Sequence, residues 1–64
     1  MSGFYVDRQG NRDHFRRAIK AAESALDQSA HRPGSVFTVW QVVPGGKDRL
    51  IGRFENGKRV LWNP

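Results

Sequence analysis

The chain contains no cysteine and no long hydrophobic run. Without cysteine it can form no disulfide framework, no thiolate zinc site and no iron–sulfur cluster. Its longest apolar stretch, Val36–Val43, is interrupted by Thr38 and Gln41 and is too short to cross a membrane. The length of 64 residues predicts a single domain, 1–64, which buries only about 60% of its unfolded surface. We therefore expect no cofactor, no metal ion and no membrane contact.

Acidic residues are few compared with basic ones. Six Asp and Glu residues stand against eleven Lys and Arg residues, which gives a formal net charge of +5. Such a charge favours an anionic partner, either a nucleic-acid phosphate backbone or an acidic protein surface. The first residues do not resemble a secretory signal, because Asp7 and Arg8 follow Phe4–Val6 directly. We therefore expect a cytoplasmic protein.

The segment from residue 12 to residue 30 lacks both glycine and proline. Asn11 is suited to cap a helix at its N-terminus, and Pro33 cannot continue one. Between them, apolar residues recur with the spacing of one helical face. These residues are Phe15, Ala18, Ile19, Ala22, Ala25, Leu26 and Ala30. The pattern predicts one amphipathic helix over residues 12–31.

The predicted helix carries its charges in an unusual order. Basic residues lie in its first half, whereas Glu23 and Asp27 lie in its second half. The helix dipole favours the reverse order, so stability does not explain the arrangement. A positive helix start is suited to anions, although the same side chains could simply form a solvated basic surface. The candidate electrostatic contacts are Arg12, Arg16, Arg17 and Lys20.

The second half of the chain is typical of β-structure. Residues 36–43 are rich in β-branched and aromatic residues, and two further predicted strands, 49–55 and 58–62, follow and are separated by turns. Asn56-Gly57 predicts a type I′ hairpin turn. A further edge strand over residues 3–6 is left open. The predicted fold is α+β: one amphipathic helix packed on a three- or four-stranded antiparallel sheet, (β)αβββ.

The hairpin turn also predicts which strand residues face the helix. It pairs Glu55 with Lys58 and Phe54 with Arg59, and a five-residue first loop would place Trp40 opposite Gly52. A one-residue slip in that loop would reverse the facing of the first strand. The predicted core is Phe15, Ile19, Ala22, Leu26, Thr38, Trp40, Val42, Leu50, Phe54 and Leu61.

In this register the second sheet face is apolar although the single helix cannot cover it. It would carry Phe37, Val39, Gln41, Val43, Ile51, Val60 and Trp62 among Arg49, Arg53 and Lys58. Either the N-terminal segment folds over this face, or the face meets a partner or a second copy of the chain. Aromatic and arginine side chains are enriched at the centres of protein interfaces. The candidate contacts on this face are Arg53, Lys58, Val60 and Trp62.

The sequence contains none of the common catalytic motifs. His31 with Arg32 and Arg53 could imitate the site of a small ribonuclease toxin. No helix-turn-helix, RNP motif or zinc finger is present. We therefore assign no catalytic residue, and the toxin is the third hypothesis.

The order of elements, with a closing turn Glu55-Asn56-Gly57-Lys58-Arg59 before Val60 and Trp62, resembles the small βαβββ counter-defence proteins of phages and mobile elements, including type I-F anti-CRISPR proteins. The resemblance covers roughly residues 12–62. It implies a non-enzymatic inhibitor in the host cytoplasm that docks on a nucleic-acid-processing protein or ribonucleoprotein complex and blocks access. The alternative is a small DNA- or RNA-binding protein that uses the same basic residues.

Overall fold

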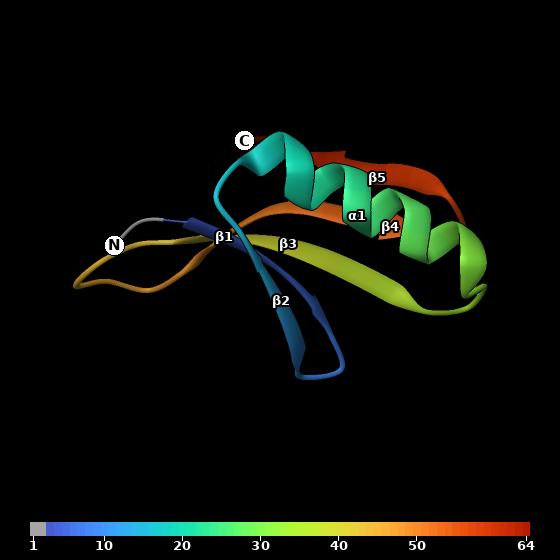
Figure 1. Cartoon of the computed structure of the whole chain (residues 1–64), viewed down its shortest axis with the longest axis horizontal. Helices are drawn as coiled ribbons and strands as arrows, with labels where there is room; N and C mark the ends of the chain where they lie inside the picture. The colour runs from blue at the N-terminus through green and yellow to red at the C-terminus, as the bar shows by residue number, and fades with distance from the viewer. Residues whose placement is uncertain (1–2) are drawn as a thin grey trace.

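One helix lies across one face of a five-stranded antiparallel sheet in the computed structural model, which describes residues 3–64 (Figure 1). The helix, α1, spans Ala18–His31. The strands are β1 (Gly3–Arg8), β2 (Asn11–Phe15), β3 (Val36–Val42), β4 (Arg49–Glu55) and β5 (Lys58–Trp62), in the sheet order β2-β1-β3-β4-β5. The predicted α+β class is confirmed. The open question about residues 3–6 is answered by β1, which is an inner strand of the sheet.

The expected start of the helix is wrong, because residues 11–15 form β2 instead. Gln9 and Gly10 both have positive φ, as a two-residue hairpin turn requires, and the Gly10 N–H donates to the Asp7 carboxylate at 3.0 Å. This turn folds β2 back onto β1, with Arg8 opposite Asn11. The edge strand is almost wholly exposed. It therefore lacks the alternation of apolar and polar residues by which a strand is recognised in a sequence.

Because α1 begins only at Ala18, most of the basic residues that were predicted in the first half of the helix lie outside it. Arg12 lies on β2, Arg16 lies between β2 and the helix, and Arg17 is the residue that precedes the first turn. Only Lys20 of the four predicted contacts lies within α1. The predicted cap at Asn11 is likewise wrong. The charge order that sequence reasoning assigned to one helix is therefore spread over a strand, a connection and a helix.

The facing of β3 is the reverse of the expected one. Phe37 and Val39 are buried against the helix at 1% and 0% exposure, whereas Trp40 lies on the opposite face. Sheet pairing moves from Val39–Gly52 to Trp40–Leu50, so Ile51 is the extra residue of a β-bulge. The bulge lets Ile51 join the core and turns Leu50 away from it. The slipped register considered for this strand is therefore the correct one for Phe37 and Val39.

The last hairpin confirms the predicted turn and then departs from the predicted register. Asn56 and Gly57 have φ of 52° and 73°, and Glu55–Lys58 and Phe54–Arg59 pair as expected. A second bulge at Val60 then shifts the pairing, so that Trp62 lies opposite Gly52. A Cβ on Gly52 would lie 2.9 Å from the Trp62 ring. An aromatic ring does cover this glycine, but it belongs to Trp62 rather than Trp40.

The helix packs on the sheet through its small residues. The core comprises Val6, Ala21, Ala22, Ala25, Phe37, Val39, Ile51 and Phe54. Ile19 and Leu26, which were expected in the core, are 52% and 39% exposed, and Leu50 and Leu61 are exposed as well. Phe15 packs at the margin of the core. Small side chains bring the helix close to the sheet and leave its larger apolar side chains outside.

Candidate nucleic-acid interface

The sheet face opposite the helix carries a ladder of three aromatic rings. Tyr5 of β1 stacks between His14 of β2 and Trp40 of β3, with ring centroids 5.5 Å and 6.4 Å apart and interplanar angles of 29° and 11°. The strand pairings set this arrangement, because Tyr5 lies opposite both His14 and Trp40. We call this surface the open face. No element covers it among residues 3–64 (Figure 1).

The central ring of the ladder is fixed from several sides. Tyr5 is only 4% exposed, and its hydroxyl donates to the Asp48 carboxylate at 2.8 Å. The Arg12 guanidinium lies 4.6 Å from the Tyr5 ring centroid, which is a cation–π contact. Burial raises the pKa of Tyr5, and its hydrogen bond to Asp48 raises it further. Tyr5 therefore orders the ladder, while its neighbours present the more accessible surface.

Hydrogen bonds also orient the Trp40 ring. Its indole N–H donates to the Thr38 hydroxyl at 2.9 Å, and that hydroxyl donates to the Asp7 carbonyl of β1 at 3.3 Å. The ring is half-buried, and His14 at the sheet edge is exposed. Rings that are already oriented lose little conformational entropy when a flat ligand stacks on them. The rings of the open face are therefore preorganised for stacking on a flat ligand.

Basic side chains flank the ladder on both sides. Arg12 lies on β2, and Arg53 of β4 lies opposite Thr38, on the same face as Trp40. Arg53 forms an exposed ion pair with Glu55, with 2.8 Å between Nε and Oε2. Such surface pairs contribute little stability, so the guanidinium can exchange partners readily. Lys58 lies opposite Glu55 in the strand register and adds a further basic side chain to this face.

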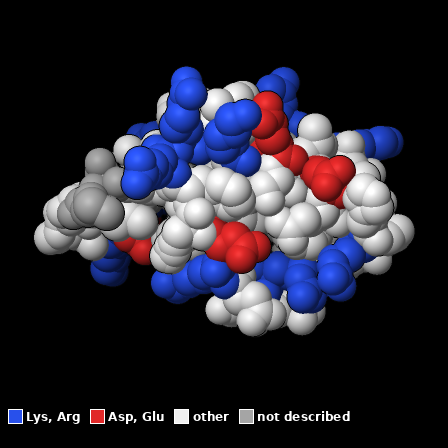
Figure 2. Space-filling view, in the orientation of Figure 1, with Lys and Arg blue, Asp and Glu red and all other residues white. Residues whose placement is uncertain are grey.

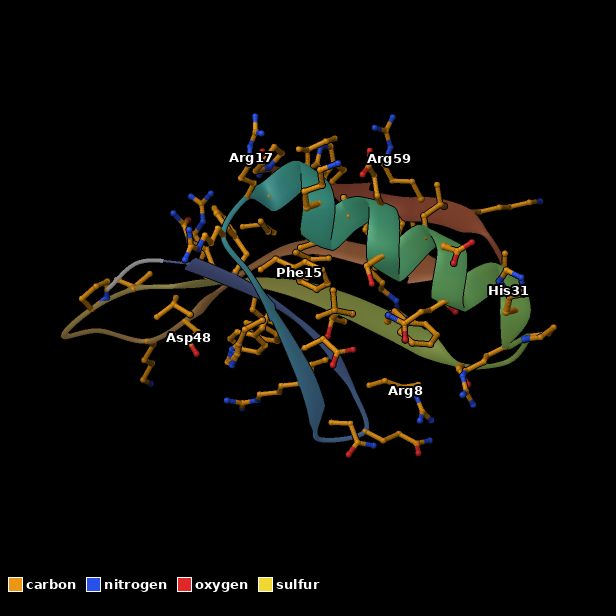
Figure 3. All side chains as sticks on the ribbon, viewed as in Figure 1. Arg8, Phe15, Arg17, His31, Asp48 and Arg59 are labelled. Atoms are coloured by element: carbon orange, nitrogen blue, oxygen red, sulfur yellow. The ribbon has the colours of Figure 1, made fainter. Side chains whose placement is uncertain are left out.

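The other predicted contacts lie elsewhere. Figure 2 shows basic side chains gathered near the start of the helix and along the opposite long edge, with acidic side chains between them. Arg17 and Arg59 project on the same side of the molecule, beside α1 (Figure 3). Trp62 packs against Phe54 on the helix side of the sheet, whereas the bulge residue Val60 is 57% exposed.

The six basic residues among the predicted contacts thus divide into two groups. Arg12, Arg53 and Lys58 lie on the open face, whereas Arg16, Arg17 and Lys20 lie around the start of the helix. The prediction that Arg53 and Trp62 share one sheet face is wrong. Arg53 lies on the open face, whereas Trp62 packs on the helix side, because the bulge at Val60 shifts the strand register.

The residues proposed for a ribonuclease site are not gathered together. The His31 imidazole contacts the Asp27 carbonyl, with Nδ1 2.8 Å from the oxygen, at the C-terminal end of α1. Arg53 extends from the sheet face opposite the helix. Within residues 3–64, no three His, Cys, Asp or Glu residues are grouped as metal ligands would be.

Tyr5, His14 and Trp40 were not predicted to form one site. Their contact depends on β2, whose polar sequence does not indicate a strand, and on the bulge that turns Trp40 away from the helix. The local sequence signal for the first hairpin is Gln9-Gly10, because a glycine readily adopts the positive φ that this turn has.

Comparisons with protein-family models, with curated proteins and with solved structures found no match. In the part of the chain that the structure describes, no helix has the length and apolar character needed to span a membrane.

Proposed function

We propose that this protein is a non-enzymatic nucleic-acid-binding protein that holds single-stranded DNA or RNA on its open face. The observation that carries the proposal is the ordered ladder His14–Tyr5–Trp40, flanked by Arg12 and Arg53 on a chain of net charge +5. Proteins that bind single strands combine aromatic stacking platforms with basic grooves that follow the phosphate backbone.

Each part of the surface has a role in this proposal. His14 and Trp40 stack on bases from the two ends of the ladder, and Tyr5 holds them at their spacing. Arg12, Arg53 and Lys58 contact phosphates, and Arg53 exchanges Glu55 for a phosphate oxygen. Stacking depends on unpaired bases, so the proposal favours single strands over duplexes.

The test is a binding titration with labelled oligonucleotides. Fluorescence anisotropy is followed for single-stranded and duplex DNA and RNA at salt concentrations from about 50 to 300 mM. We expect single strands to bind best and the affinity to fall steeply with salt, because counterions are released from the phosphates. Absence of binding at the lowest salt, or equal binding to single strands and duplexes, would contradict the proposal.

A matched pair of variants separates the open face from general charge. Arg12→Ala with Arg53→Ala removes two positive charges from the open face, and Arg16→Ala with Arg17→Ala removes two near the helix start. We expect the first pair to weaken binding by about tenfold or more and the second pair by much less. Equal losses would mean that only the net charge matters.

A phage-type inhibitor of a nucleic-acid-processing complex is the second candidate function. The observation in its favour is the exposed basic group Arg16, Arg17 and Lys20 around the start of α1, which is complementary to an acidic protein surface. Its test is a pull-down from a bacterial lysate with Arg17→Glu as the control. Loss of a captured complex in the variant is the expected result.

A further inference from the structure

An apolar groove lies between α1 and the C-terminal edge of the sheet. Its volume is about 410 Å³, and its lining includes Ile19 and Leu26 from the helix and Phe54 and Trp62 from the strands. Glu23 and Arg59 line it as well. The groove exists because α1 packs through alanines and leaves Ile19 and Leu26 on the side toward β5. These two side chains are 52% and 39% exposed, so the sheet residues across the groove do not cover them.

The strand beside the groove has a free edge. Among residues 3–64, β5 pairs only with β4, so its outer backbone groups are available for another strand. Val60 and Leu61 on β5 are 57% and 42% exposed. A strand added beyond β5 would extend the sheet beneath the exposed side of α1. Its alternate side chains would then cover Ile19 and Leu26.

The charges around the groove select the chemistry of the added strand. Lys58 and Arg59 lie on β5 itself and form a basic edge beside the groove. The one acidic residue in the lining, Glu23, is paired with Lys20, with 3.4 Å between Nζ and Oε1. A second copy of the chain would bring the same basic edge and a net charge of +5. An acidic segment is therefore the complementary occupant.

We propose that β5 and the adjoining groove form a docking site for an extended acidic segment of a partner protein. The segment adds as a sixth strand to β5 and places apolar side chains in the groove between α1 and Trp62. Backbone hydrogen bonds supply affinity, the groove selects apolar side chains at alternate positions, and the basic edge selects acidic ones between them. This site shares Lys58 with the open face. Its groove lies on the helix side of the sheet, and docking there does not depend on nucleic-acid binding.

The probe is a synthetic seven-residue peptide, EVEIEVE, with blocked ends, titrated into isotopically labelled protein and followed by NMR. We expect shifts centred on β5 and the groove, slower amide exchange along β5, and a dissociation constant below about 1 mM. A peptide with Lys in place of each Glu, and one with Pro in place of the central Ile, should bind at least tenfold more weakly. Absence of binding by EVEIEVE at 1 mM, or equal binding by all three peptides, would overturn the proposal.

Two variants with the same change in charge complete the test. Ile19→Glu alters the groove, and Val43→Glu alters an exposed valine beyond the end of β3. We expect Ile19→Glu to weaken peptide binding at least tenfold and Val43→Glu by less than twofold. Equal effects, or a protein that runs as a dimer and loses its dimeric state in Ile19→Glu, would overturn the acidic-segment proposal. Oligonucleotide binding by Ile19→Glu should stay within twofold, so failure of one site is distinguishable from failure of the other.

Discussion

The two faces of the sheet are held in order by different means. On the helix side, Phe37, Val39 and Ile51 are held by apolar packing in the core and have almost no exposure. On the open face, the aromatic rings are oriented by hydrogen bonds and a cation–π contact rather than by a covering layer. The covered face is expected to contribute most of the stability, and the open face to supply an ordered surface for a ligand.

The largest expected effect is a truncation on the covered face. Phe37→Ala should lower the free energy of unfolding by about 3–5 kcal/mol, because it removes a side chain that is 1% exposed and leaves a cavity. Val36→Ala changes the preceding residue of β3, which faces the other way and is 37% exposed. Urea unfolding followed by circular dichroism measures both. Equal losses would show that the facing of β3 is wrong.

Substitutions at two glycines test how closely the end of α1 approaches the turn between β4 and β5. Gly57→Ala should cost about 2 kcal/mol or more, because Gly57 has positive φ and its new Cβ would lie 3.1 Å from the Ala30 Cβ. Gly10→Ala imposes a similar backbone strain in the first hairpin, but its Cβ would meet nothing within 4 Å, so about 1 kcal/mol is expected. Thermal unfolding of both variants measures the difference. A larger loss for Gly10→Ala would contradict the close approach of α1 to the last hairpin.

The smallest effect concerns the polar support of the open face. Tyr5→Phe removes the hydrogen bond to Asp48 and should cost about 1 kcal/mol at neutral pH. Because burial and the hydrogen bond to Asp48 raise the pKa of folded Tyr5 above the ordinary value of about 10, the unfolded chain loses this proton first, and stability falls as the pH rises above about 10. Urea unfolding at a series of alkaline pH values should therefore show the advantage of the wild type over Tyr5→Phe shrinking. A constant difference would exclude the assigned environment of Tyr5.

The fold class and the last hairpin could be predicted from the sequence because their signals are local. Asn56-Gly57 specifies the turn between β4 and β5, and the β-branched and aromatic run of residues 36–42 specifies β3. The start of the helix could not be predicted, since the polar segment 11–15 continues the helical pattern without any break. Its identity as a strand depends on pairing with β1.

The candidate site was predicted only in part for a related reason. Arg12 and Arg53 were identified by charge, but the aromatic ladder between them requires two strands and a bulge that no local pattern indicates. A bulge changes which residues face the helix while leaving the composition of the strand unchanged. The facing of Trp40 and Trp62 is therefore a property of the assembled sheet.

The pairing of β1 with β3 also has a consequence for how the chain assembles. The first hairpin and the β3–β4–β5 meander each pair neighbours in sequence, and the β1–β3 pairing joins them across the intervening helix. Closing that long connection is the costly step in folding. The contact between Tyr5 and Trp40 lies across the β1–β3 pairing. A ligand that binds His14 and Trp40 together would link the first hairpin to the β3–β4–β5 meander. It would therefore slow the unfolding of the whole domain.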